Sequence, residues 1–209
     1  MRASTPANHA PERETMTHEP DFDFGPFPVL ETERMILREL LPEDGPGIFG
    51  IRGDYEVTKY NGGMNYTRLD QAEALIASIR DAYRDKRSVR WGMTLKGGDD
   101  AVIGMCGYNY WVRADFRGSI GYDLARAYWG RGLMPEALRA ILTFGFEHMA
   151  LNRVEADASI NNRQSMRVLE KVGFLREGHQ REQFYENGEF GDLVLFSLLK
   201  RDFRATDEG

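Results

Sequence analysis

Two glycines, Gly130 and Gly132, stand directly before a segment with helical periodicity that starts near Met134. The first amide groups of a helix have no partner inside the helix, and the helix dipole places partial positive charge at that end. Glycine also lets the backbone approach a bulky ligand without interference from a Cβ atom. A strand-like segment, residues 118–124, leads into this turn. The spacing therefore predicts a site for a phosphate-bearing cofactor.

The elements that position this turn alternate between strands and helices. Asp70 is expected to cap a helix, with Glu73 completing a capping box, and Asn187-Gly188 is expected to turn the last hairpin. The expected strands are residues 33–40, 91–95, 102–111, 118–124, 153–158, 174–186 and 190–199. One helix is expected to start near residue 42, and three others are expected at residues 70–83, 134–149 and 164–171. This order predicts a mixed α/β (α+β) sheet with a single core.

The composition argues against several classes of protein. The chain has 209 residues, 42% of them apolar, which is enough for one domain with a substantial core. The net charge of -6 and the lack of a dense basic tract argue against nonspecific nucleic-acid binding. No apolar run approaches the length that crosses a bilayer. The single cysteine, Cys106, and the absence of metal-ligand spacing among four histidines predict a cytoplasmic protein without a disulfide or a metal site.

The first 28 residues differ in composition from the rest of the chain. They hold five prolines and many charges, and they offer little that could be buried. They also lack the apolar region of a signal peptide. We expect a disordered tail over residues 1–28 and one domain over residues 29–205, with Met16 as an alternative start.

Eight motifs follow one another between about residue 30 and residue 203. They are Thr32-Glu-Arg-Met-Ile-Leu-Arg38, Ile120-Gly-Tyr-Asp-Leu124, Tyr128-Trp-Gly-Arg-Gly132, Glu136-Ala137, Asn152-Arg153, Asn162-x-x-Ser165, Val168-Leu-Glu-Lys-Val-Gly-Phe174 and Asp192. In this order the chain resembles the GNAT superfamily of N-acetyltransferases, in the branch similar to the RimJ/RimL ribosomal-protein acetyltransferases. The resemblance implies a GNAT fold, in which helices flank a twisted, mostly antiparallel sheet that is splayed between strands 4 and 5, here residues 118–124 and 153–158.

The resemblance also implies the ligand of the glycine turn, because the family places acetyl-CoA in this splay. Backbone groups of residues 122–124 would hold the pantetheine arm, and the amides of residues 131–134 would cradle the pyrophosphate. Pro135 and Ala127 depart from the family pattern, each with the loss of one polar contact. The implied cofactor-binding residues are Tyr122, Asp123, Leu124, Trp129, Gly130, Arg131, Gly132, Leu133, Met134, Asn162 and Ser165.

Acetyl transfer to an amine needs a proton donor for the departing thiolate and an acceptor for the proton of the amine. Ser165 and Tyr185 are the candidate donors, and Ser165 matches the position favoured in RimL-like relatives. Relatives often carry an acidic residue where this chain has Phe184. The candidate bases are therefore Glu182, which strand alternation places on the same face as Phe184 and Glu186, together with Glu186, Asp123 and His179.

The resemblance predicts an acetyl-CoA-dependent N-acetyltransferase in which a primary amine attacks directly in a ternary complex. The RimJ/RimL likeness suggests a protein N-terminal α-amine as the acceptor. A small-molecule or antibiotic amine is an alternative acceptor, and a regulatory module that binds CoA without turnover is an alternative function. No P-loop motif is present, which argues against a nucleotide hydrolase. No nucleic-acid or membrane partner is expected, and both a monomer and a homodimer agree with the sequence.

Overall fold

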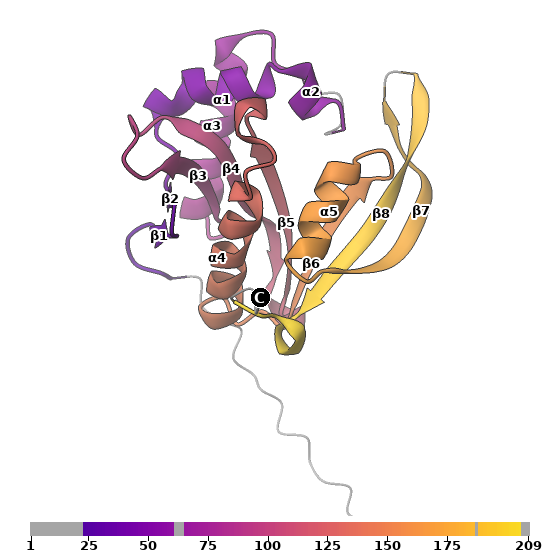
Figure 1. The fold of residues 1–209 in the computed structure, drawn as a ribbon. Coiled ribbons are helices and arrows are strands. Elements are labelled where there is room, and N and C mark those ends of the chain that lie inside the picture. The colour runs from indigo at the N-terminus through magenta and orange to yellow at the C-terminus, as the bar shows by residue number, and fades with distance from the viewer. Residues whose placement is uncertain (1–22, 61–64, 187, 206–209) are drawn as a thin grey trace, which may run out of the picture.

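The structure is a computed structural model that describes residues 23–60, 65–186 and 188–205. Its elements are β1 (Leu30–Glu31), β2 (Met35–Arg38), α1 (Gly45–Arg52), α2 (Tyr55–Thr58), α3 (Leu69–Arg84), β3 (Arg90–Leu95), β4 (Val102–Val112), β5 (Arg117–Leu124), α4 (Leu133–Glu147), β6 (Arg153–Ser159), α5 (Arg163–Lys171), β7 (Leu175–Glu186) and β8 (Glu189–Leu199). This order confirms the predicted mixed α/β fold (Figure 1).

One sheet runs through the molecule in the order β1-β2-β3-β4-β5-β6-β8-β7. All neighbouring strands are antiparallel except β5 and β6, which are parallel. That parallel pairing covers only residues 117–119 of β5 and 153–155 of β6. Beyond these residues the two strands separate, as expected for residues 118–124 and 153–158, and the backbone edge of β5 is left open to a ligand.

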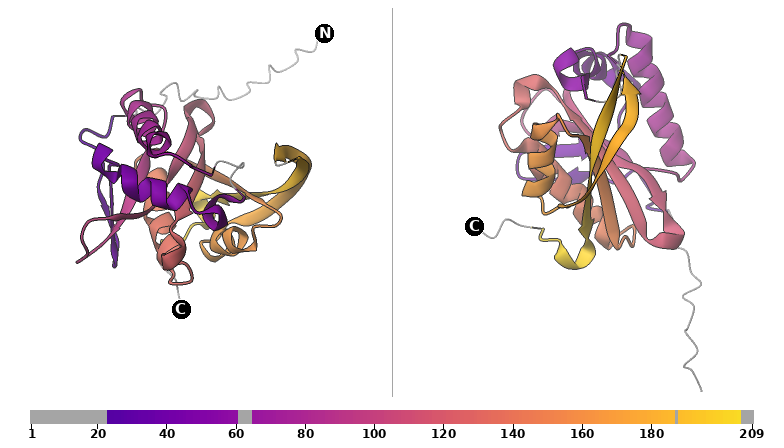
Figure 2. Two further views of the ribbon diagram at one scale, coloured as in Figure 1. Left: turned by 90° about the horizontal axis from the view of Figure 1, so that it is seen from above. Right: turned by 90° about the vertical axis from the view of Figure 1, so that its right-hand side faces the viewer.

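The two faces of the sheet carry different helices, as the right-hand view of Figure 2 shows. On one face, α1 and α3 bury a core that includes Ile48, Ile76 and Met105. On the other face, α4 and α5 bury a larger core that includes Leu138 and Leu169. Side chains alternate along each strand, so neighbouring residues of β5 serve opposite faces. This alternation decides which residues of β5 and β6 face each side of the sheet where the two strands separate.

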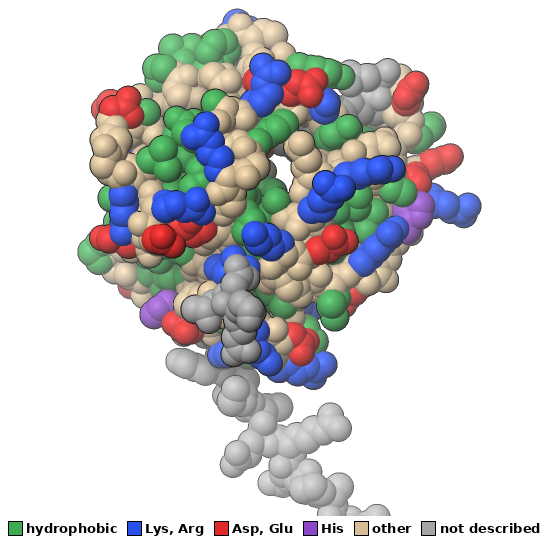
Figure 3. All heavy atoms as spheres, in the orientation of Figure 1, with side chains coloured by type: hydrophobic (Ala, Val, Ile, Leu, Met, Phe, Trp, Pro, Cys, Tyr) green, Lys and Arg blue, Asp and Glu red, His purple; other side chains and the backbone are tan. Residues whose placement is uncertain are grey.

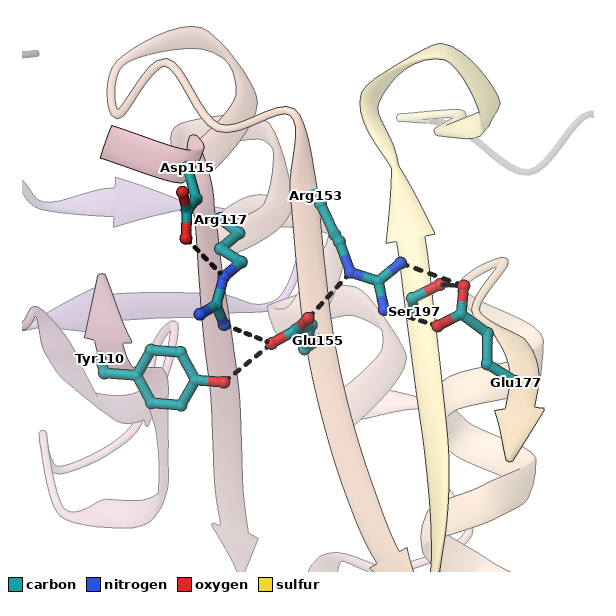
Figure 4. Close-up of polar contacts among 7 residues, drawn as sticks. All are labelled: Tyr110, Asp115, Arg117, Arg153, Glu155, Glu177 and Ser197. Atoms are coloured by element: carbon teal, nitrogen blue, oxygen red, sulfur yellow. Dashed lines mark hydrogen bonds and ion pairs between the residues drawn. The ribbon is translucent and has the colours of Figure 1, made fainter. Parts of the chain in front are cut away.

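A network of ion pairs joins the strands at the end where β5 and β6 pair (Figure 4). Glu155 of β6 accepts from Arg153 at 2.8 Å, from Arg117 of β5 at 3.2 Å and from Tyr110 of β4 at 2.8 Å. Arg153 also binds Glu177 of β7, with Nη2 and Oε2 2.5 Å apart. The network therefore spans β4 to β7 and fixes the place at which the splay starts.

Several element boundaries differ from the sequence-based predictions. Asp70 is not the cap of α3, because this helix begins at Leu69 and the Gln71 side chain accepts from the backbone of Thr67 and Arg68. The expected strand at residues 33–40 is shorter, and it is preceded by β1. Pro42–Asp44, where the first helix was expected to start, form a 3-10 turn, and α1 begins at Gly45. The other strand and helix ends move by only a residue or two, which is the usual uncertainty of such boundaries. Helix α2 was not predicted, because its four residues are too few to show a helical period of hydrophobic residues.

Part of the predicted tail packs against the domain. The ring of Phe24 lies 4.9 Å from that of Phe144, and the ring of Phe27 lies 4.8 Å from that of Tyr83. The indole of Trp91 donates to the carbonyl of Pro28 at 2.6 Å. Residues 23–28 therefore belong with the core, whereas the rest of the predicted tail lies outside the described residues.

The long hairpin of β7 and β8 is irregular where it leaves the body of the sheet. The register shifts between Gln180 and Phe184, and Glu182 in this bulge has a left-handed φ of 51°. The bulge breaks the alternation that would have placed Glu182 on the face of Phe184. Asn187 lies outside the described residues, and Gly188 beside it has a φ of 87°.

Candidate functional site

A cleft of about 830 Å³ lies where β5 and β6 separate. Its walls come from β5, β6, α5 and the turn before α4, and from α1, β3 and β4 at its other end. Figure 3 shows an opening near the middle of this face of the molecule, with basic side chains around it. Among the described residues, no group of acidic, histidine or cysteine side chains could hold a metal ion. None of the helices in the described part of the chain is long and apolar enough to cross a membrane.

The glycine turn predicted to bind phosphate opens into this cleft. Gly130 and Gly132 have φ values of 73° and 76°, a left-handed conformation that L side chains rarely adopt. Gly132 caps α4, so the amides that follow it, at Leu133 and Met134, belong to the first turn and lack partners within the helix. No atom lies within 4 Å of the place where a Cβ of Gly130 would stand. The turn therefore fits a pyrophosphate bound by backbone amides.

Two of the motif residues hold this turn in place. The guanidinium of Arg34, just before β2, donates to Glu136 of α4 at 2.7 Å and to the carbonyl of Arg131 at 2.8 Å. Desolvation alone would raise the pKa of Glu136, but its hydrogen bonds, those with Arg34 among them, lower it. The side chain of Arg131 lies outside the lining of the cleft and its guanidinium stands over the ring of Tyr128. Arg34 thus positions the turn, which sequence reasoning did not anticipate.

The hydroxyl groups of Tyr122 and Ser165 meet across the splay, 2.7 Å apart. Asn162 caps α5 by accepting from the Ser165 amide at 3.1 Å. Burial raises the pKa of Tyr122, and its hydrogen bond to Ser165 acts in the opposite direction. Tyr122 therefore stays protonated at neutral pH, with its hydroxyl directed at Ser165.

Trp129 of the glycine turn and Leu124 at the end of β5 are hydrogen-bonded to each other. The indole of Trp129 donates to the carbonyl of Leu124 at 2.7 Å. That carbonyl thus has one of its lone pairs occupied, although Leu124 was expected to offer it to a ligand. Trp129 and Leu124 both line the cleft. The contact fixes the end of β5 relative to the glycine turn.

Three polar residues from the α1 and α3 side of the sheet line the cleft without having been predicted. Arg52 of α1 binds the buried carboxylate of Asp123, with Nη2 and Oδ2 2.6 Å apart. Arg90 of β3 donates to the side-chain oxygen of Asn109 in β4. The Nε atoms of Arg52 and Arg90 are buried and lack a hydrogen-bond partner among the described residues. Desolvation lowers the pKa of Arg90.

Two cations on α5, Arg167 and Lys171, also line the cleft on the side of Ser165. They are four residues apart and so project from one face of the helix. Their spacing could have been noticed in the sequence, because residues 164–171 were expected to form a helix. They add positive charge to the wall of the cleft that α5 forms.

The remaining candidates lie away from the cleft or at its edge. Tyr185 is 65% exposed and its ring faces Phe190 at 4.9 Å. Phe184 lines the cleft, whereas Glu182 and His179 do not. Asp192 of β8 accepts from the amide of Glu182 at 2.8 Å and lies 2.6 Å from His179, so it links β8 to β7.

Comparison with known proteins gives consistent results. The acetyltransferase (GNAT) domain family matches residues 34–175. The uncharacterized N-acetyltransferase p20 of Bacillus licheniformis is 36% identical over 175 residues, which cover 84% of this chain and 98% of that protein. The uncharacterized N-acetyltransferase YoaA of Bacillus subtilis is 33% identical over 174 residues, 83% and 98% of the two chains. The solved structure of RimL, a ribosomal α-N-protein acetyltransferase in complex with coenzyme A, matches with a TM-score of 0.75 at 16% identity over 82% and 98% of the chains.

Proposed function

Because the chain belongs to the GNAT family of N-acetyltransferases, we propose that it binds acetyl-CoA in the splay between β5 and β6 and transfers the acetyl group to a primary amine. One observation carries the proposal: the left-handed glycine turn and the Ser165 hydroxyl open into the same cleft. The first supplies amides for a diphosphate, and the second supplies a donor for sulfur.

The cofactor end of the cleft has the groups that such a ligand needs. The amides of residues 131–134 would bind the pyrophosphate, and the cations of Arg167 and Lys171 would offset its charge. The open edge of β5 at Tyr122, Asp123 and Leu124 would hold the pantetheine arm. Acetyl-CoA supplies the activated acetyl group, and the residues of the chain orient it.

Ser165 would then donate a hydrogen bond or a proton to the sulfur. A serine hydroxyl alone is a poor acid, but the hydroxyl of Tyr122 lies 2.7 Å away and can return a proton to it. Tyr185 was the other candidate donor from the sequence. Its exposure of 65% and its place outside the cleft favour Ser165.

The acceptor is proposed to be a protein N-terminal α-amine, for two reasons. The pKa of such an amine is about 7.7, against about 10.4 for a lysine side chain, so more of it is neutral and reactive at pH 7. RimL, whose fold this chain shares, acts on an N-terminal amine. A panel of peptides with free or blocked N-termini, lysine peptides and small-molecule amines would test this by the release of free thiol from acetyl-CoA. If only small-molecule amines were acetylated, the acceptor would be a small molecule and not a protein N-terminus.

Substitution of the turn tests the cofactor site. Gly132→Glu would add bulk and negative charge where the pyrophosphate is expected, and we expect the Kd for CoA, measured by calorimetry, to rise by about 100-fold or more. Gly97→Glu is the matched control, because Gly97 has a φ of 74° and open space around it in the turn between β3 and β4. Equal affinity in both variants would contradict the proposed site.

A further inference from the structure

One carboxylate on the wall of the cleft has no role so far. Asp157 lies in β6, beside the splay, and its Cα partner on the other side is Leu195 of β8. Its neighbours Ala156 and Ala158 are buried in the core under α4 and α5. Strand alternation therefore directs Asp157 to the α1 and α3 side, where it lines the cleft.

Asp123 reaches the same side from the other wall. Its Cα partner in β4, Met105, belongs to the core under α1 and α3. Tyr122, the next residue, contacts Ser165 on the opposite side. The splay thus has a cofactor side with Ser165 and an acceptor side with Asp123 and Asp157.

Asp123 and Asp157 are the two acidic residues among the described residues that line the cleft. The carboxylate of Asp123 is held by Arg52 at 2.6 Å and is almost fully buried. Asp157 forms no hydrogen bond or ion pair with the described side chains, and it is exposed to the cleft. Of the bases considered from the sequence, Glu182 and His179 lie outside the lining. Asp157 is therefore the carboxylate that an incoming amine can reach.

The surroundings of Asp157 make its carboxylate more basic than usual. Desolvation raises its pKa and is the single cause of the shift. The other charged side chains along the cleft are Arg52, Arg90, Asp123, Arg167 and Lys171, and three tyrosines, Tyr122 among them, also line it. None of these groups contributes to the shift, so no close cation stabilises the ionised form.

We propose that Asp157 binds the acceptor amine and takes its proton during acetyl transfer, in place of the acidic residue that Phe184 replaces. The inference rests on the proposed function. As the amine nitrogen bonds to the acetyl carbon it becomes strongly acidic, so a carboxylate suffices as the base. The carbon–sulfur bond breaks, and the thiolate receives a proton from Ser165. Water then takes the proton from Asp157 and, through the hydroxyl of Tyr122, restores that of Ser165, so that the net reaction moves one proton from nitrogen to sulfur.

The test compares Asp157→Asn with the native enzyme in thiol-release assays between pH 5 and pH 9. A general base contributes about 100- to 10,000-fold, so we expect kcat to fall by at least about 100-fold while the Kd for CoA stays the same. Because the carboxylate must be ionised to act, kcat/KM of the native enzyme should rise with pH through the pKa of Asp157. Asp157→Asn should lose that rise, and Asp157→Glu should partly restore both rate and profile.

Glu147→Gln serves as the control, since Glu147 is an exposed carboxylate at the end of α4. It should retain native activity. If Asp157→Asn keeps the native kcat and pH profile, Asp157 is not the base, although the enzyme is still an acetyltransferase. If the native enzyme turns over no amine while CoA binds, the proposed function fails instead, because that result does not depend on Asp157.

Discussion

At the scale of single residues, the side of the cleft that is proposed to bind the cofactor contains a pair of hydroxyl groups. Ser165 and Tyr122 come from α5 and β5, on opposite walls of the splay, and they lie 2.7 Å apart. Burial raises the pKa of Tyr122, which keeps its proton in place. In the proposed reaction, the pair would give Ser165 a proton source that a lone serine lacks.

We predict that Ser165→Ala lowers kcat by about 100-fold, since a positioned acid contributes about that much or more. Tyr122→Phe should lower it less, because the serine hydroxyl remains and only its proton source is lost. Both variants should keep the native Kd for CoA in calorimetry. Native turnover in Ser165→Ala would exclude this hydroxyl as the donor.

Sequence reasoning found the residues of this site that depend on local signals. Gly130, Gly132 and Asn162 can be recognised in the sequence because each stands next to the start of a helix. Arg52 and Arg90 gave no such signal, because their partners Asp123 and Asn109 lie 71 and 19 residues further along the chain. Contacts of this kind depend on which strands pair and on how the helices cover them.

At the scale of elements, ion pairs join β5, β6 and β7, and Ser197 of β8 donates a hydrogen bond to Glu177 of β7. Together these contacts hold the closed end of the splay. Glu177 lies at one end of the network, where Arg153 and the hydroxyl of Ser197 lower its pKa from 4.5 to about 2. A carboxyl group whose pKa is lower in the folded state stabilises the fold above its unfolded pKa. This contribution disappears as the pH falls through the folded pKa.

We therefore predict that Glu177→Gln is less stable than the native protein at pH 7, by up to about 1 kcal/mol, since the pair is largely exposed. The difference should shrink between about pH 4.5 and pH 2, where the native side chain becomes protonated. Urea unfolding at a series of pH values measures both. Glu170→Gln, on the exposed face of α5, is the control and should show no such trend.

The order and type of the elements were predicted well because most strands and helices carry a clear hydrophobic period. The bulge in β7 was missed, since nothing in the residues around Glu182 marks a left-handed conformation there. The amide of Glu182 is instead held by Asp192 of the neighbouring strand. Strict alternation therefore gave the wrong face for Glu182, one of the four candidate bases predicted from the sequence.

At the scale of the whole molecule, the segment before β1 closes the core that the sheet and α4 share. Phe27 packs between Tyr83 and Trp91, with ring centroids 4.8 Å and 6.0 Å apart, and Phe24 packs on Phe144. Sequence composition placed both phenylalanines in a tail, because the surrounding prolines and charges masked them. Two partly buried rings that pack on the core attach a segment that is otherwise polar.

We predict that Phe27→Ala lowers the free energy of unfolding by about 1–3 kcal/mol, somewhat less than for a fully buried ring. Its activity should be native at temperatures where the variant is folded, since Phe27 lies outside the cleft. Phe190→Ala is a suitable comparison, because Phe190 is 64% exposed and contacts Tyr185. Equal thermal stability of the two variants would show that the segment does not contribute to the fold.

The short pairing of β5 with β6 leaves a cleft that is lined by residues from both faces of the sheet. We predict that the acetyl donor and the amine enter from opposite faces of the sheet, so that neither must depart before the other arrives. Initial rates measured while both concentrations vary should give intersecting double-reciprocal lines, and desulfo-CoA should compete with the donor alone. Parallel lines would mean that the acetyl group is bound covalently to the protein between two half-reactions.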